Sequence, residues 1–247
     1  MPLPFADERG AETSDNDDDG QRASGREAMG GEAARSRGWA GRAPSVRRLA
    51  ASPAAVAGLL GLAAFVVYLR TLAVSIVWGD SPELTAAAFN AGIPHPTGYP
   101  LYMLLAHAFM RLVPVGSIAY RMNLLAALSA GIAVALIYRL LLRVSGARWA
   151  SVVTALAFAY SRTFWSQSVI AEHYPFAILC IAAVLGCVLA WDRRGERCWL
   201  FTSAVVYGFC LTHHMMSLLL APGLLYFALT SRHRSQFLRE LPRTVPL

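Results

Sequence analysis

The amino-acid sequence predicts an all-α integral membrane protein, a bundle of about six membrane-spanning helices of which some are short. Three observations support this fold class. First, 56% of the 247 residues are hydrophobic and only 15% are charged, against roughly 25% charged residues in soluble domains. Second, the chain holds several apolar runs near the roughly 20 residues that cross a bilayer. Third, arginines cluster between these runs, as the positive-inside rule requires of cytoplasmic loops.

Residues 1–50 are expected to form a disordered cytoplasmic tail. They are rich in Gly, Ala, Asp and Arg and contain almost no aromatic residues, so they cannot bury enough apolar surface to fold. The acidic start of the chain lacks the apolar segment of a secretory signal peptide. Residues 51–235 are expected to form the N-terminal part of a transmembrane domain, and residues 236–247 a short tail.

Five apolar runs follow the N-terminal tail. They cover residues 53–77, 118–142, 149–164, 174–191 and 199–230. The last run is too long for one ordinary span, and Thr212, His213 and His214 interrupt it. We therefore interpret it as two short helices that meet at this break. With six spans, every arginine cluster falls on the side of the N-terminus, which the positive-inside rule makes cytoplasmic.

The six-span topology separates the acidic residues that follow the tail. Half of them lie among the cytoplasmic arginines, where solvated ion pairs are their ordinary role. The others, Asp80, Glu83 and Glu172, fall on the far side of the membrane, together with five of the six histidines. Because these three acids come from separate parts of the chain and have no arginine cluster beside them, they are candidate functional residues.

The first far-side loop, residues 78–117, contains two of these acids. Ser81 followed by a proline is typical of a helix start, with Ser81 as the N-cap. Asp80 and Glu83 would then gather at the helix N-terminus, where the helix dipole favours negative charge. The alternative for Asp80 is a simple capping role. Residues 101–113 suit a helix that lies along the membrane interface.

The same loop contains the segment Pro-His-Pro-Thr-Gly-Tyr-Pro at residues 94–100. Three prolines restrict its backbone, and the glycine permits a conformation that other residues resist. Such a stiff turn can hold His95 and Tyr99 at defined positions, which suits a binding site. The alternative is a structural elbow with an aromatic anchor.

A second far-side cluster contains Arg162, Glu172 and His173. A charged residue at the centre of a membrane costs roughly 2.5–3.5 kcal/mol on insertion scales, so an ionisable residue near the membrane is a functional candidate. The alternative is a structural ion pair between Arg162 and Glu172. A satisfied polar contact is the simpler interpretation of His173, whereas His213 and His214 are stronger candidates because they lie where a span is broken.

Four motifs resemble those of a known family. They are Trp78–Leu84, His95–Pro100, Ala119–Leu125, and Phe164–Gln167 with Ala171–Tyr174. In order and spacing they are similar to the polytopic GT-C-type family that includes the eukaryotic transmembrane protein O-mannosyltransferase acting on plexin-type receptor domains. The resemblance covers about residues 60–230. Pro82 departs from the glycine usual in the family, and the resemblance implies further spans, and often a C-terminal domain, beyond the sixth span of this chain.

The resemblance implies a GT-C-like bundle whose active site faces the lumen or periplasm. Such an enzyme moves a sugar, here mannose, from a polyprenyl- or dolichyl-phosphate donor to a hydroxyl acceptor such as a protein Ser or Thr. It implies Asp80 as the catalytic base. The site neighbours that it implies are Glu83, His95, Tyr99, Arg121, Asn123 and Glu172. We predict that Glu83 and Glu172 are catalytic together with Asp80, and that the other four bind substrate. To these we add Arg162, His173 and His213 as substrate-binding candidates, and we expect a guanidinium of Arg121 or Arg162 to bind the phosphate.

The expected partners are membrane lipid, the lipid-linked sugar donor and a protein acceptor. No cofactor is expected, and no nucleic acid, because no basic stripe with interleaved aromatic residues is present. The expected location is the endoplasmic reticulum membrane in a eukaryote or the plasma (inner) membrane in a bacterium, with the N-terminus cytoplasmic.

Two other classes of function remain open at this point. One is a non-catalytic truncated membrane protein or a transporter module, although transporters place their sites near the midplane of the membrane. The other is a metal site formed by Asp80, Glu83, Glu172 and a histidine. These ligand types are suitable for a metal, but no HExxH or comparable spacing occurs, so no metal is expected.

Overall fold

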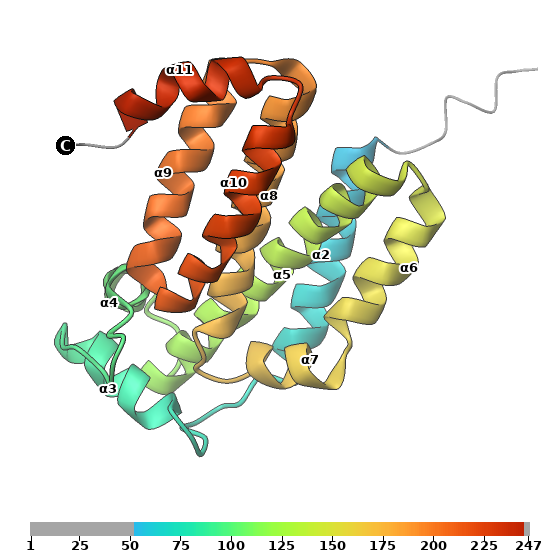
Figure 1. The fold of residues 1–247 in the computed structure, drawn as a ribbon. Helices are drawn as coiled ribbons and strands as arrows, with labels where there is room; N and C mark the ends of the chain where they lie inside the picture. The colour runs from blue at the N-terminus through green and yellow to red at the C-terminus, as the bar shows by residue number, and fades with distance from the viewer. Residues whose placement is uncertain (1–51, 245–247) are drawn as a thin grey trace, which may run out of the picture. The chain divides into compact units, whose positions relative to one another are not determined.

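The computed structural model describes residues 52–244, so the tail expected at residues 1–50 lies outside the described residues. Within the described part every regular element is helical, which confirms the predicted all-α class (Figure 1). The elements are α2 (Pro53–Arg70), α3 (Ser81–Asn90), α4 (Pro100–Leu112), α5 (Ile118–Ser145), α6 (Arg148–Ala159), α7 (Arg162–Ser168), α8 (Tyr174–Arg194), α9 (Arg197–His213), η2 (Met215–Leu220), α10 (Ala221–Thr230) and α11 (Arg234–Thr244).

Three helices, α2, α5 and α8, are long and apolar enough to cross a membrane. Helix α5 is the central one, because it packs against α2, α6 and α8. The chain therefore has the character of a membrane protein. The expected count of six spans stays a prediction, because the other apolar helices are shorter than these three.

The apolar run expected to form the third span is divided between two helices. Helix α6 ends at Ala159, and Ser161 then caps α7, its Oγ accepting the backbone N–H of Phe164 at 3.4 Å. A helix of 12 residues rises roughly 18 Å, whereas the hydrocarbon core is roughly 30 Å thick. Helix α6 is therefore too short to cross a membrane by itself. The first run likewise ends as a helix at Arg70 instead of residue 77.

The last apolar run breaks where the sequence indicates. Helix α9 ends at His213, and His214 has an extended backbone. The Nδ1 atom of His214 accepts the backbone N–H of Met216 at 3.0 Å and so caps η2, which continues into α10. Two helices therefore meet at the histidine pair.

Helices α2 and α5 approach each other closely at a pair of glycines. A Cβ atom on Gly61 would lie 2.6 Å from the carbonyl oxygen of Gly131, and one on Gly131 would lie 2.9 Å from the Cβ of Phe65. Small residues at such a crossing let two helix backbones come together in a membrane protein. Helix α2 is also tied to α6, because the Tyr68 hydroxyl donates to the carbonyl oxygen of Ala159 at 2.8 Å.

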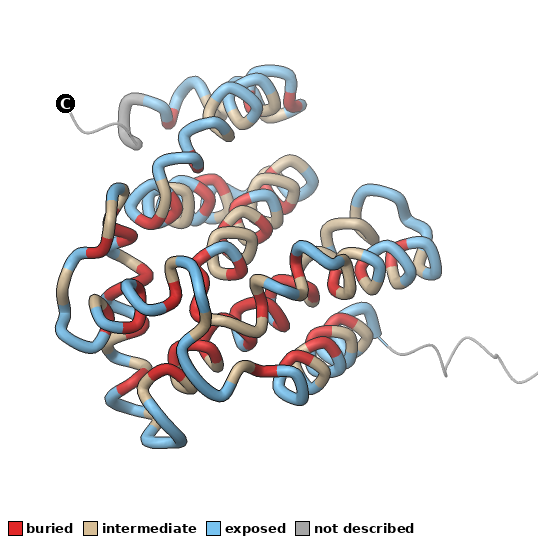
Figure 2. The backbone as a smooth tube through the Cα atoms, turned by 90° about the horizontal axis from the view of Figure 1, so that it is seen from below, coloured by how far each residue is buried: buried red, intermediate tan, exposed pale blue. Residues whose placement is uncertain are grey.

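The outer faces of the helices are apolar. Figure 2 shows buried and exposed positions alternating along the helices, and large aliphatic side chains such as Leu59, Leu62 and Val153 are among the exposed ones. Leu84, Tyr102, Met110 and Met122 form a buried cluster that fixes α3 and α4 against the start of α5. This cluster supports the segment that contains α3 and α4.

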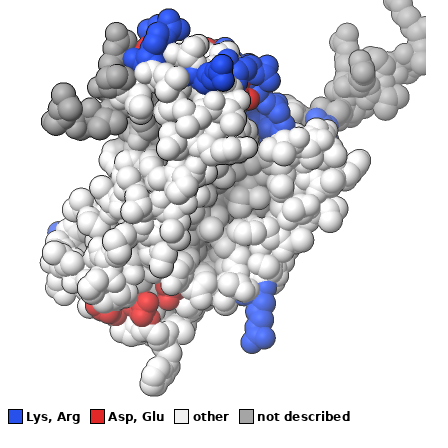
Figure 3. Space-filling view, in the orientation of Figure 1, with Lys and Arg blue, Asp and Glu red and all other residues white. Residues whose placement is uncertain are grey.

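The two ends of the bundle differ in charge: most of the arginine surface gathers at the upper end, and an acidic patch lies at the lower end, where some arginine is also exposed (Figure 3). Arginines gather at what we call the arginine end, where α5 and α8 end and α9 begins. Asp80, Glu83 and Glu172 lie at the other end, which we call the acidic end. Helix α11 lies at the arginine end (Figure 1), where Gln236 accepts a hydrogen bond from the Trp191 indole at 3.0 Å. Residues expected as a tail from 236 onward are thus helical as far as Thr244.

Candidate functional site

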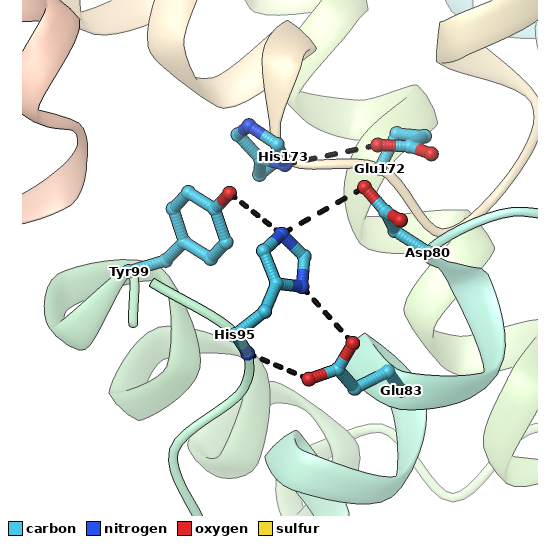
Figure 4. A network of polar contacts seen from close by, with 6 residues as sticks. All are labelled: Asp80, Glu83, His95, Tyr99, Glu172 and His173. Atoms are coloured by element: carbon cyan, nitrogen blue, oxygen red, sulfur yellow. Dashed lines mark hydrogen bonds and ion pairs between the residues drawn. The ribbon is translucent and has the colours of Figure 1, made fainter. Parts of the chain in front are cut away.

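Helix α3 begins at the acidic end with two carboxylates. Its N-cap is Asp80, not Ser81 as the sequence suggests, and the Asp80 carboxylate makes no capping hydrogen bond. The Asp80 side chain keeps 47% of its surface exposed, and Glu83 in the first turn keeps 50%. Both carboxylates point towards His95 in residues 94–100, which we call the proline-rich loop (Figure 4). The Asp80 carboxylate is therefore not used as a helix cap.

His95 is held against α3 by two contacts with Glu83. The backbone N–H of His95 donates to Glu83 Oε1 at 2.6 Å, and its ring Nδ1 lies 3.0 Å from Glu83 Oε2. These two hydrogen bonds lower the pKa of Glu83. Glu83 is therefore a carboxylate near neutral pH, and it determines the orientation of the His95 ring.

The second ring nitrogen of His95 faces two other polar groups. Its Nε2 lies 3.0 Å from the Tyr99 hydroxyl and 3.8 Å from Asp80 Oδ2. Tyr99 has a left-handed backbone, with φ of 46°, directly before α4, and its side chain is almost fully buried. Burial raises the pKa of Tyr99, and the nearby Tyr174 and acidic groups add to this effect. Tyr99 therefore stays protonated, and its hydroxyl can donate a hydrogen bond to His95 Nε2.

Glu172 joins this group from the loop between α7 and α8. Only 6% of the residue is exposed, and its Oε2 lies 3.7 Å from His173 Nδ1 without a hydrogen-bond partner. Burial, followed by the charge of Asp80, raises the pKa of Glu172 to about 7. The loop is fixed by Tyr102, whose hydroxyl donates to the Glu172 carbonyl oxygen at 3.0 Å. The three acidic residues thus converge at one end of the bundle, as the sequence predicts.

Aromatic rings form the floor of the site. The Tyr99 ring stacks on His173 with 4.1 Å between centroids, and His173 stacks in turn on His214 at 5.2 Å. His213 contacts Phe176 edge-on at 4.9 Å. Both nitrogens of His173 and of His213 are buried without a hydrogen-bond partner. The break after α9 therefore brings a histidine pair beneath the proline-rich loop.

The opposite pKa shifts of Glu172 and His173 predict opposite effects on the pH dependence of stability. The pKa of Glu172 rises from 4.5 to about 7, so the folded state holds a proton that the unfolded state releases, and stability falls as the pH rises through this window. Burial, with nearby His213 and His214, lowers the pKa of His173 from 6.5 to about 3. The contribution of His173 to the stability of the folded state therefore falls as the pH decreases below 6.5.

We expect the melting temperature of Glu172→Gln, measured relative to the unmodified protein, to increase as the pH is raised from 5 to 7. The same measurement on His173→Asn should show a relative decrease. His95 acts on both groups, Asp80 acts on Glu172, and His213 and His214 act on His173. All four are present in every sample, so the comparison separates the two contributions. Parallel pH profiles for both variants and the unmodified protein would contradict the two assignments.

Three residues expected in the site do not contact its acidic side chains in the described part of the chain. The Arg121 guanidinium donates to the carbonyl oxygens of Met110 at 3.0 Å and Gly116 at 3.2 Å, so it holds the end of α4. Asn123 donates to the carbonyl oxygen of Ala73 at 2.7 Å and so fixes the chain after α2. Arg162 is exposed at the start of α7 and forms no ion pair with Glu172 among the described residues.

Two residues of the site are not among the predicted binding residues. The sequence places His214 beside His213 in the expected break of the last run, but only His213 is predicted to bind substrate. Tyr102 lies within an ordinary apolar helix, and nothing in its pattern marks its contact with residue 172. Among residues 52–244, no group of three or more His, Cys, Asp or Glu side chains is arranged to hold a metal ion, so the metal-site alternative has no ligand set in this part of the chain.

Comparisons with known proteins identify what the chain is similar to. Residues 80–237 match the family model described as "Protein O-mannosyl-transferase TMEM260 N-terminal domain". The chain is 36% identical over 127 residues to protein O-mannosyl-transferase TMEM260 of Mus musculus, covering 51% of this chain and 18% of the relative. It is 26% identical over 129 residues to protein O-mannosyl-transferase tmem260 of Dictyostelium discoideum, covering 51% of this chain and 16% of the relative. The chain thus spans less than a fifth of these relatives, and no solved structure matches it.

Proposed function

The chain belongs to the family of the protein O-mannosyl-transferase TMEM260 N-terminal domain, and from this premise we propose that it supplies the acceptor-activating part of a membrane mannosyltransferase. In this proposal mannose moves from a polyprenyl- or dolichyl-phosphate donor to a hydroxyl of a protein Ser or Thr. The matched residues begin at Asp80 and include every candidate site residue. The names of the two relatives support the transfer of mannose to protein.

The Asp80 carboxylate is the observation that carries this proposal. It is half-exposed, makes no capping hydrogen bond and lies 3.8 Å from the imidazole of His95. A general base must reach the proton that it removes. The Asp80 side chain is 47% exposed and so accessible to an acceptor hydroxyl from outside, whereas Glu172 is only 6% exposed. Access to the acceptor therefore favours Asp80 over Glu172 as the base.

The proposed reaction is a single displacement at the anomeric carbon. Asp80 removes the proton of the acceptor hydroxyl while the hydroxyl oxygen forms a bond to that carbon. The bond from the carbon to the phosphate oxygen breaks, and the lipid phosphate leaves with the electron pair. Because the leaving group departs as an anion, no protein acid has to protonate it. Arg162 remains the candidate for binding the phosphate, since the guanidinium of Arg121 already donates to backbone carbonyls.

An apolar cavity beside the site suits the lipid part of such a donor. It has a volume of about 400 Å³ and lies between α6, α7 and α8, with Phe158, Phe164, Tyr174 and Ile178 in its lining. Tyr174 links this cavity to the floor of the site, because its ring lies 4.1 Å from that of His173 between centroids. We place the first isoprenoid units of the donor in this cavity. The acidic end then faces the lumen of the endoplasmic reticulum in a eukaryote or the periplasm in a bacterium.

The donor class is tested with the full-length protein purified into lipid nanodiscs. Polyprenyl-phosphate mannose and GDP-mannose, each radiolabelled, are offered separately with folded secretory domains that carry Ser and Thr residues. We expect label on the acceptor only from the lipid-linked donor. Equal transfer from the nucleotide sugar would overturn the donor assignment. Absence of transfer from both donors, in protein that melts cooperatively, would favour a non-catalytic or transport role and overturn the proposal.

A further inference from the structure

The contacts of Glu83 determine which nitrogen of His95 carries a proton. Glu83 Oε1 accepts the backbone N–H of His95 at 2.6 Å, so Oε2 is the oxygen that faces the ring at 3.0 Å. A carboxylate can only accept hydrogen bonds. The neutral imidazole must therefore carry its proton on Nδ1. This leaves a lone pair on Nε2, the atom that faces Asp80.

The surroundings of Nε2 suit a proton acceptor. The Tyr99 hydroxyl lies 3.0 Å from it and donates in the resting state. A hydroxyl can rotate to accept instead, so Tyr99 does not have to move when Nε2 gains a proton. Asp80 Oδ2 lies at 3.8 Å, and 33% of the His95 side chain is exposed, which leaves room for a bridging water. An imidazolium formed here would have Glu83, Asp80 and the Tyr99 oxygen around it.

We propose that Glu83 and His95 form a proton relay behind Asp80, which rests on the proposed function above. Asp80 takes the proton of the acceptor hydroxyl and passes it to Nε2 of His95. The imidazolium keeps its Nδ1–H bond to the Glu83 carboxylate, which stabilises the positive charge, and later loses the Nε2 proton to water. His95 thus restores the Asp80 carboxylate for the next turnover. Glu83 is a positioning residue that acts through His95 by selecting its tautomer.

Glu83→Gln gives the sharpest test of this relay. The backbone N–H of His95 needs an acceptor, so the Gln carbonyl oxygen should occupy the place of Oε1 and its NH₂ group should face Nδ1. A donor at that place forces the ring proton onto Nε2 and removes the lone pair that faces Asp80. We expect kcat for transfer to fall by about 10²-fold or more, within the range typical of proton-transfer catalysis, with the KM values for donor and acceptor unchanged.

The tautomer is measured directly by ¹⁵N NMR of histidine-labelled full-length protein, with the His95 signals identified by their loss in His95→Gln. We expect an Nδ1–H tautomer in the unmodified protein and an Nε2–H tautomer in Glu83→Gln. The matched control is Glu196→Gln at the arginine end, where Glu196 contacts Trp199 and Cys198. This control should change neither the tautomer nor kcat.

A double variant separates the relay from a purely structural role. If Glu83 acts only through His95, adding Glu83→Gln to His95→Gln should lower kcat no further than His95→Gln alone. An Nε2–H tautomer in the unmodified protein, an unchanged kcat in Glu83→Gln despite the flipped tautomer, or additive losses in the double variant would each overturn the relay. The NMR result does not depend on turnover. Failure of the mannosyl transfer itself, as in the donor experiment, is therefore distinguishable from failure of the relay.

Discussion

Asp80→Asn is expected to reduce mannosyl transfer by about 10²–10⁴-fold, the range that a general base contributes. Asparagine has the same shape as aspartate but cannot remove a proton from the acceptor hydroxyl. The variant should remain folded, because the Asp80 carboxylate makes no capping hydrogen bond and is half-exposed. The rate is measured with the lipid-linked donor at saturation, and folding is measured by the melting temperature.

The same variant has a second, independent effect. The charge of Asp80 is the second largest cause of the raised pKa of Glu172, so Asp80→Asn should lower that pKa. An infrared titration of the Glu172 carboxyl, identified by its loss in Glu172→Gln, would detect the change. Asp192→Asn serves as the control, since Asp192 lies at the arginine end and bonds to Ser231 at 2.6 Å. Transfer at the unmodified rate in Asp80→Asn would reject Asp80 as the base.

Gly61→Val is expected to prevent α2 from docking on α5. A Cβ at this position would lie 2.6 Å from the carbonyl oxygen of Gly131, and a backbone atom cannot move aside as the tip of a side chain can. Overpacking of an interior typically costs about 1–3 kcal/mol and occasionally more. Because the contact is with backbone, we expect a cost at the upper end, seen as a lower melting temperature and a smaller folded fraction in detergent.

Gly58→Ala on the same helix is the matched control for this prediction. Nothing lies within 4 Å of a Cβ atom built on Gly58, and alanine is the better helix former by about 1 kcal/mol. The control should therefore be neutral or slightly stabilising. If Gly61→Val and Gly58→Ala melted at the same temperature, the close approach of the two helices would not be a determinant of stability.

Part of the site could be predicted from the sequence because its features are local. Asp80, Glu83, His95 and Tyr99 lie within one short loop whose prolines limit its conformations. Their proximity therefore needs few assumptions about the rest of the fold. Placing Glu172 beside them required the topology as well, and the arginine clusters between the apolar runs indicated it through the positive-inside rule.

Other parts could not be predicted, for physical reasons that differ. Arg121 and Asn123 donate to backbone carbonyls, and a carbonyl acceptor has no sequence signature because every residue carries one. Helix α6 is shorter than its apolar run because the chain turns at Ser161. Ser161 is the N-cap of α7, and this role can be recognised only once α7 is known. The helical character of residues 234–244 depends on contacts with α8 that lie far away in sequence.

The order of the site residues along the chain affects how the protein is made. Domains generally fold in the direction of synthesis, and the four residues between 80 and 99 leave the ribosome long before the segment that contains Glu172 and His173. The corner formed by Asp80, Glu83, His95 and Tyr99 can therefore assemble first, with its floor open to water. Only when α8 inserts is Glu172 buried against that corner, so a nascent chain that stalls before residue 172 would hold the proton-accepting groups but not the buried carboxyl.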